Sequence, residues 1–597
     1  MVGERDTDNV YANWGLNLFA NTPALKTVVL PETLTSIGIS CFENSGVQNI
    51  NLSSSITHIS ERAFYNCDNL VDAQLSANLA YLGDNAFYDC ANLEIANLYF
   101  GLDYLGSQAF AFCVKLKEAY IPATVTTLSG NPFMGCSGLE KFELDPDNAN
   151  FVMVDDILYD KTMYTLLIYP ASAVSDTFEF PESVREIGIA AFVGAQLKHM
   201  EFPGTITKVA EGAFRRSTLE SVTFHRGMTA IGNYAFEGCA NLNNVTILNT
   251  ITTLGDYAFA NCTKLTDFVF EDAVEGGTPY AIGTHFFDGC TSITEMIMPN
   301  KMTLSDAEVA SLKYLGNRNA AIPGYMFANT GIVNAVIPMW ITDVGTSGVF
   351  ANCQKLETVE FANKKVNSMI LGDAFFSNCS KLKKVDLPAG ISLPINSDTT
   401  FENCTALEEV NIYAASTMFL TINAGFPGCT SLHTLDLYQV NGYEYDEAGN
   451  AIGYTSVTKA YPLSYALNTF HGLKAMKYVR LSGLFGAYVQ GPVFKDSGIE
   501  TVVVNSAAVY IQETTDGEPF SRTTALKDVW INASSLTVTA NSFANLSTDV
   551  NFYFYNYTYE QVVAMAKGDS WFTNADEKAH FYFKDTIPEG TKIPEGV

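Results

Sequence analysis

Basic charge is scarce in this chain of 597 residues. The chain has 34 Lys and Arg against 64 Asp and Glu, which gives a formal net charge of −30. Nucleic acids and anionic lipid surfaces are bound by clustered Lys and Arg, so this balance argues against both kinds of partner. Charged residues make up only 16% of the chain and apolar residues 47%, which excludes a disordered acidic tail.

Long apolar runs are also missing. No stretch approaches the ~18 apolar residues of a membrane span, and the N-terminal Met1-Val2-Gly3-Glu4-Arg5-Asp6 lacks the apolar region of a secretory signal. The C-terminal residues 591–597 are a polar Pro/Gly stub of the kind that leads into a linker. We expect no membrane insertion by this chain, which is either cytosolic or a mature or trimmed form.

Catalytic and metal-binding signatures are lacking as well. The seven His are scattered without an H-E-x-x-H, and there is no G-x-S-x-G, P-loop or G-x-G-x-x-G. The 12 Cys include no C-x-x-C and no Cys/His cluster with zinc spacing. The sequence therefore predicts no catalytic residue, no cofactor and no metal site, and it argues that the protein is not an enzyme.

An internal repeat centred on Phe is what the chain has in abundance. Residues 63–67, Ala-Phe-Tyr-Asn-Cys, recur as 86–90, Ala-Phe-Tyr-Asp-Cys, and the step of 23 residues is kept for two further units. After the Cys come a Leu or Ile, a short alternating segment such as 139–144, often a Pro, and a second apolar pair such as 125–128. The repeated Phe stands at positions 19, 42, 64, 87, 110, 133, 192, 214, 236, 259, 287, 327, 350, 376, 401, 426, 470, 494, 520 and 543, which makes 20 units.

The physical chemistry of one unit predicts the architecture. The alternating segment is a short strand with one buried face, and the Pro ends it because proline has no N–H for the ladder. Ala, Phe and Cys are expected on a short helical or 3₁₀ turn that an Asp caps. One unit buries almost nothing alone, but stacked units form continuous internal ladders. We predict an elongated, curved, β-dominated solenoid whose parallel sheet takes one strand per turn of about 23 residues.

The cysteines follow the same register. Eleven of the 12 lie three residues after a repeat Phe, and Cys41 takes the Ala position beside Phe42. Elsewhere the position holds Ser, Thr, Ala or Leu, so we interpret it as a place for a small buried residue. Stacked Cys point the same way, which is the wrong geometry for a disulfide. We expect buried free thiols that act as small apolar side chains.

Interruptions of the period suggest the organisation of the chain. We expect hairpins in the first and third insertions, a short capped helix at 305–312 in the second, and a strand, a helix and a closing strand in the C-terminal cap. The expected segments are an N-terminal tail or cap at 1–18 with Trp14 and Leu16, a solenoid at 19–548 with insertions near 145–172, 300–322 and 438–462, and a C-terminal cap at 549–597.

The repeat resembles the BspA-like leucine-rich repeat family. Residues 231–242, Ile-Gly-Asn-Tyr-Ala-Phe-Glu-Gly-Cys-Ala-Asn-Leu, match its pattern closely, and the segment from Asp155 to Pro170 resembles an insert common in that family. The resemblance covers about 19–548. It implies a leucine-rich repeat solenoid on a bacterial surface or secreted protein, or on one from some parasitic protists, with adhesion to host matrix proteins and co-aggregation as family roles. It supplies no catalytic motif and no shared binding motif.

The outward strand positions hold the candidate ligand contacts. They are acidic with interspersed basic residues, which suits either a solvated surface or a broad surface for a basic or mixed protein partner. Three aromatic residues among them are candidate anchors. The residues chosen as candidate contacts are Tyr120, Glu143, Glu360, Tyr478 and Trp530.

Two functions from different classes follow. The first is a non-enzymatic adhesin, extracellular or at the cell surface, whose extended sheet binds a protein or glycan ligand on host matrix, mucin or neighbouring cells. Its signal peptide and anchor would lie outside this chain. The alternative is a structural spacer or assembly subunit that presents another domain or packs into a surface appendage.

Overall fold

The computed structural model divides into two compact units, residues Met1–Tyr280 and Ala281–Val597, and each is described by itself. The expected helix at 305–312 and most of the expected N-terminal cap lie outside the described residues. The structure describes residues 16–272, 277–304, 321–341, 346–392, 399–415, 420–422, 426–432, 434–447, 451–458, 463–465, 477–483, 487–490, 494–513 and 517–594.

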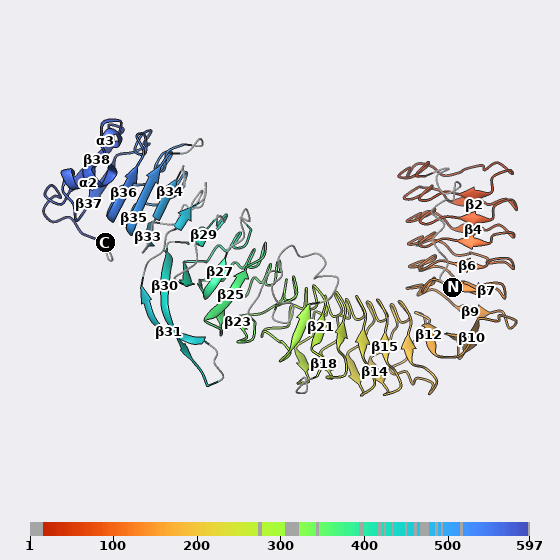
Figure 1. Cartoon of the computed structure of the whole chain (residues 1–597). Helices are drawn as coiled ribbons and strands as arrows, with labels where there is room; N and C mark the ends of the chain where they lie inside the picture. The colour runs from red at the N-terminus through yellow and green to blue at the C-terminus, as the bar shows by residue number, and fades with distance from the viewer. Residues whose placement is uncertain are drawn as a thin grey trace. The chain divides into compact units, whose positions relative to one another are not determined.

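Most regular turns of the solenoid in the first unit contribute two short strands, which stack from one turn to the next (Figure 1). In β7 (Glu118–Ile121) the residues alternate between exposed and buried, as the sequence pattern predicts. Pro122 follows β7 directly, and the chain then turns a corner into β8 (Thr127–Leu128). The predicted parallel solenoid is confirmed. Its turns carry a second strand that was not predicted, because the apolar pair after the Pro also forms a ladder.

These strands build parallel ladders from one turn to the next. The two-residue strands are β1 (Ser36–Ile37), β3 (His58–Ile59), β5 (Tyr81–Leu82), β6 (Tyr104–Leu105), β8, β13 (Glu186–Ile187), β15 (Lys208–Val209), β17 (Ala230–Ile231) and β19 (Thr253–Leu254). The longer strands are β2 (Asn49–Asn51), β4 (Asp72–Gln74), β7, β9 (Lys141–Leu144), β14 (His199–Phe202), β16 (Ser221–Phe224), β18 (Asn244–Ile247) and β20 (Asp267–Phe270).

A β-hairpin replaces the regular content of one turn, as predicted for the first insertion. Strands β10 (Phe151–Val154) and β11 (Ile157–Asp160) pair antiparallel, and β12 (Thr165–Ile168) returns the chain to the parallel ladder beside β13. The corner after β12 carries Tyr169 in the position of the repeat Phe. Its ring stacks on Phe192 at 4.8 Å, so the turn is present although its marker residue was not recognised.

The core is a column of stacked aromatic rings. The rings of Phe42, Phe64, Phe87 and Phe110 follow one another with centroid distances of 5.0, 4.9 and 5.3 Å, nearly parallel. All four rings have 0% exposure. Each ring is therefore covered by the turns on both sides, which is why an isolated unit has no stable core.

The corner that holds the Phe is an irregular turn rather than the expected helical or 3₁₀ turn. The backbone conformation of its residues explains the difference. The residues two before and two after Phe64, Arg62 and Asn66, have φ of 56° and 54°. A regular right-handed helix cannot continue through residues in this left-handed conformation. Local bonds, such as that from the Tyr65 N–H to the Arg62 carbonyl at 3.0 Å, therefore alternate with bonds between turns, such as that from the Phe64 N–H to the Ala86 carbonyl at 2.7 Å. Asn tolerates this conformation better than most residues, which explains its recurrence in the repeat.

The cysteine thiols are hydrogen-bond donors as well as small core residues. The Cys90 thiol donates to the Phe64 carbonyl at 3.1 Å, and the Cys239 thiol to the Phe214 carbonyl at 3.1 Å. In the same position, the Thr330 hydroxyl donates to the carbonyl of Phe327 at 2.7 Å. Where this position holds Cys or Thr, it therefore supplies a hydrogen-bond donor to a main-chain carbonyl as well as a small buried side chain. All 12 Cys are free and buried, and burial raises the pKa of Cys239 to about 12.

The second unit continues the same stacking with longer strands towards its end. Strands β30 and β31 form the hairpin predicted near 438–462. Its Gly-Asn turn lies outside the described residues. The strands are β21 (Tyr280–Ile282), β22 (Met302–Leu304), β23 (Asn334–Ile337), β24 (Thr358–Phe361), β25 (Lys365–Ile370), β26 (Lys384–Leu387), β27 (Ala389–Ser392), β28 (Glu409–Ala415), β29 (Leu420–Ile422), β30 (Thr434–Tyr445), β31 (Ala451–Thr458), β32 (Leu463–Tyr465), β33 (Tyr478–Gly483), β34 (Ala487–Gln490), β35 (Thr501–Gln512), β36 (Asp528–Val538), β37 (Val550–Phe554) and β38 (Ala579–Phe583).

The predicted strand, helix and closing strand are present at the C-terminal end of the second unit. Strand β37 is followed by α2 (Tyr559–Ala566), a short α3 (Ser570–Thr573) and β38. The Trp571 ring is 1% exposed and packs edge-to-face on the last repeat Phe, Phe543, at 5.8 Å. These elements therefore cover the end of the aromatic column.

Candidate binding surface

The register of the parallel strands gathers outward side chains into rows. In the first unit β7 pairs with β9, which places Glu118 beside Lys141 and Tyr120 beside Glu143. We call these four residues the β7–β9 face. All four side chains are exposed, whereas the alternate residues of both strands, such as Ala119 and Phe142, are buried. The alternation in sequence thus produces a charged face with one aromatic residue.

Two predicted contacts, Tyr120 and Glu143, are neighbours on this face. The Tyr120 ring is 38% exposed. Its hydroxyl donates a hydrogen bond to Asp145, and this bond raises the pKa of Tyr120 to about 12. The Glu143 carboxylate forms an ion pair with Lys141 at 2.8 Å. The face therefore keeps a neutral phenol at physiological pH, between carboxylates and one paired cation.

A similar row lies on the second unit. We call Glu360 of β24, Lys384 and Asp386 of β26, and Glu409 of β28 the β24–β28 face. The Lys384 ammonium lies 2.9 Å from Glu409 and 3.6 Å from Asp386. The pKa of Lys384 is raised, mainly because its ammonium donates a hydrogen bond to Glu409. Glu360 is exposed and, among the described residues, forms no ion pair. Three carboxylates and one cation leave this face acidic.

The β30–β31 hairpin folds back onto the far end of the β24–β28 face. The Tyr454 ring of β31 stacks on Tyr413 of β28 at 4.8 Å, and its hydroxyl donates to the Lys364 carbonyl at 3.1 Å. The Lys364 N–H in turn donates to the Ala451 carbonyl at 2.9 Å. Asn411, at an outward position of β28, is only 3% exposed. The insertion therefore covers part of the sheet face.

The other two predicted aromatic contacts lie on the outward face of the last strands. The Arg480 Nε donates to the Tyr478 hydroxyl at 3.1 Å. Trp530 is 2% exposed and stacks on Tyr553 at 4.1 Å. The outward position expected for Trp530 is correct, but its ring is not an exposed anchor. Aromatic neighbours in adjacent strands bury one another there, which alternation within a single strand does not reveal.

The five predicted residues do not form one site. The structure brings Tyr120 and Glu143 together, and it places Tyr478 and Trp530 in one aromatic cluster. Glu360 lies on a separate face. The other members of the two faces were not among the candidates; they are Glu118, Lys141, Lys384, Asp386 and Glu409. Their signal was present, since all stand at alternate positions of their strands, but the pairing of strands selects which residues become neighbours.

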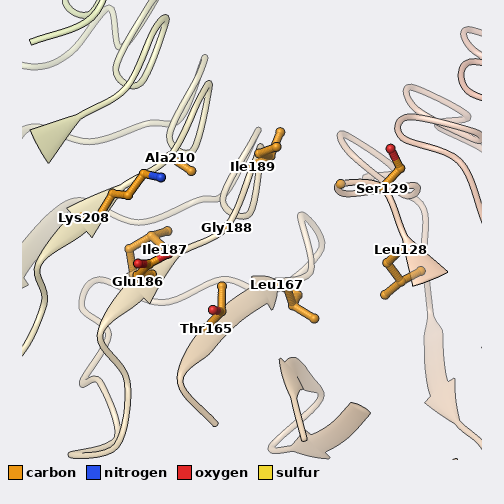
Figure 2. A pocket seen from close by; sticks show the side chains of 11 residues that line it. Leu128, Ser129, Thr165, Leu167, Glu186, Ile187, Gly188, Ile189, Lys208 and Ala210 are labelled. Atoms are coloured by element: carbon orange, nitrogen blue, oxygen red, sulfur yellow. The ribbon is translucent and has the colours of Figure 1, made fainter. Parts of the chain in front are cut away.

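A groove of 270 Å³ lies in the first unit where the hairpin interrupts the ladder (Figure 2). One wall is formed by Leu128, Ser129 and Gly130 at the end of β8. The other wall comes from β12, β13 and β15 and the corners that follow them. Its lining residues are Thr165, Leu167, Glu186, Ile187, Gly188, Ile189, Lys208 and Ala210.

Comparison with known proteins now gives the family. The model of the BspA type leucine rich repeat region matches six copies, at residues 13–140, 172–294 and 320–443. The chain belongs to the BspA-type leucine-rich repeat family. The resemblance inferred from the Phe-x-x-Cys repeat is therefore confirmed. Proteins with such repeats are in general binding proteins of the cell surface that have no enzymatic activity.

Several solved structures are similar to parts of this chain. A leucine-rich repeat protein from Eubacterium ventriosum is 20% identical over 66% of this chain and 80% of its own, with a TM-score of 0.34. A leucine rich cell surface protein from Faecalibacterium prausnitzii is 20% identical over 71% and 86%, with a TM-score of 0.31. The pneumococcal vaccine antigen PcpA is 16% identical over 64% and 80%, with a TM-score of 0.31. None of the curated proteins matches the chain.

Among the described residues, helices are confined to α2 and α3. Neither helix that they contain combines the length and the apolar character that a bilayer crossing requires. Nowhere in the described ranges do three or more His, Cys, Asp or Glu gather in a way that would hold a metal ion.

Proposed function

We propose that this protein is a non-enzymatic cell-surface or secreted adhesin that binds a basic protein, or a glycan-bearing protein such as a mucin, through its outward strand faces. Host matrix proteins and the surfaces of neighbouring cells are the partner classes that we propose. The observation that supports this most is the composition of the two faces. Each holds three acidic or phenolic groups around one paired Lys on a rigid parallel ladder.

A rigid face lowers the entropic cost of association, since its side chains stand on paired strands whose backbones are fixed before binding. An acidic surface on a chain with a net charge of −30 also attracts basic partners at long range and disfavours acidic ones. Tyr120 supplies the aromatic contact that interface hot spots favour. These features support recognition of a protein surface rather than of a small molecule in a cleft.

The test is binding of the purified chain to an array of host matrix proteins, mucins and glycans at low and high salt. We expect a saturable hit that weakens as salt increases. Tyr120→Ala combined with Glu143→Gln should weaken that hit about tenfold, and Glu360→Gln combined with Asp386→Asn tests the second face. Thr246→Ala, an exposed outward residue of β18, is the matched control.

A blank array with well-folded protein would count against the adhesin and favour the structural spacer or assembly subunit. That alternative predicts self-association, which sedimentation at increasing protein concentration measures directly. If binding occurs but neither pair of substitutions alters it, the faces are not the contact surface.

A further inference from the structure

One parallel ladder of the first unit ends at an open strand edge. The order of its strands is β1-β3-β5-β6-β8, and within the described residues β8 pairs with β6 alone. The next turn is replaced by the hairpin, and β12 pairs with β11 and β13 instead. Natural sheets usually protect such an edge with Lys, Pro or a covering segment, whereas β8 is Thr127-Leu128 and borders the groove.

The main-chain groups at this edge point towards the groove. The Thr127 N–H donates to the Asp103 carbonyl and the Ser129 N–H to the Leu105 carbonyl, both at 3.2 Å and both towards the preceding turn. Because successive residues of a strand direct their polar groups to opposite sides, Leu128 directs its N–H and carbonyl away from β6. Within the described residues, neither group bonds to any segment other than β6.

The side chains around the groove are also available. Thr165, Glu186 and Lys208 are adjacent in the register of β12, β13 and β15. Within the described part of the chain, Glu186 and Lys208 form no ion pair, and the hydroxyls of Ser129 and Thr165 form no hydrogen bond. Leu128 and Leu167, which are both partly exposed, supply apolar surface. Figure 2 shows Leu128 and Ser129 across the groove from Leu167 and Thr165.

We propose that this groove binds an extended basic peptide segment of a partner protein as an added strand beside β8. The peptide backbone pairs with the N–H and carbonyl of Leu128, in the manner of β-strand addition. Side chains on its inward face are small and apolar. An outward Arg or Lys stands beyond Thr127 and faces Glu186, which is the one carboxylate among the residues that line the groove. Lys208 lies one strand further, about 4.8 Å more distant.

The peptide groove is independent of the β7–β9 and β24–β28 faces. It recognises main-chain geometry, whereas the faces recognise side chains on a folded surface. The two sites can therefore succeed or fail separately. The overall charge of −30 favours a basic segment at the groove as it favours a basic partner on the faces.

The test uses a fluorescein-labelled peptide, Ser-Val-Arg-Val-Ser with blocked ends, and fluorescence anisotropy with the full chain. We expect saturable binding that weakens about tenfold when the backbone amides of the two Val are N-methylated, since the charge is kept and the strand hydrogen bonds are lost. Glu186→Gln should weaken binding three- to tenfold, about the loss of one exposed charge pair. Glu220→Gln, an exposed carboxylate outside the groove, should leave binding unchanged.

Several results would overturn the proposal. They are the absence of saturable binding, equal binding of the N-methylated peptide, an equal effect of both Glu substitutions, or tighter binding when Glu replaces Arg in the peptide. Tyr120→Ala should not affect this peptide, because Tyr120 lies on the β7–β9 face. Loss of array binding with intact peptide binding would therefore refute the adhesin faces but keep the groove, and the reverse pattern would refute only the groove.

Discussion

Removing one ring from the aromatic column tests the physical basis of the fold. Phe236 is 0% exposed and stacks on Phe214 at 5.2 Å and on Phe259 at 5.1 Å. Phe236→Ala removes roughly 100 Å³ of side chain, and a cavity that does not collapse costs about 24 cal/mol per Å³. With about 2 kcal/mol for lost burial, we expect local destabilisation of about 4 kcal/mol.

The assay is native-state hydrogen exchange, because a long repeat array does not unfold in two states. The amides to follow are those of Phe214 and Phe236, which donate to the Ala235 and Ala258 carbonyls at 2.7 and 2.8 Å. We expect large losses of protection there and small effects several turns away. Thr246→Ala should change stability by less than about 0.5 kcal/mol. Unchanged protection at Phe214, or an equal loss along the whole chain, would refute the column as the local source of stability.

Three further predictions concern the thiols, the corners and the second hairpin. Cys239→Ala should destabilise its turn by about 1–2 kcal/mol through the lost bond to Phe214. The pKa of Cys239 rises from 9.0 to about 12 on folding, so the unfolded chain loses the thiol proton first. Stability should therefore fall as pH rises from 9 to 12. The midpoint of urea unfolding should fall less over this pH range in Cys239→Ala than in the unaltered chain. Asn66→Ala should cost about 1 kcal/mol more than Asn66→Gly by hydrogen exchange at the Phe64 amide, because φ of residue 66 is 54°. Equal costs would contradict the backbone argument. Replacing 440–456 by a short Gly-Ser linker should preserve the circular-dichroism melt and increase exchange at Asn411, whereas a collapsed melt would show that the hairpin is part of the stack.

The repeat made much of the fold predictable. Leu and Phe at fixed offsets require that each turn be covered by its neighbours, so the stacked parallel ladders follow from one unit. The two hairpins and the elements at the C-terminal end were predicted from turn residues and alternation. The turn marked by Tyr169 was not predicted because Phe defines the repeat in the other turns, although the Tyr169 ring fills the same place in the column.

The candidate site was less predictable than the fold. Alternation identified outward positions such as Tyr120 and Trp530 equally well. The structure leaves the first 38% exposed and the second 2% exposed. The difference arises because neighbours in adjacent strands decide whether an outward ring remains accessible, and those neighbours lie 23 or more residues away in sequence.

The sequence by itself determined the solenoid, its family and the free buried thiols, because these properties depend on local spacing repeated many times. Only the tertiary structure decided the left-handed corners, the acidic pairs on each face and the contact of the β30–β31 hairpin with Tyr413. It also decided the open edge at Leu128. A strand edge is open only if no other segment pairs with it, and that depends on where a hairpin inserted after β9 directs the chain.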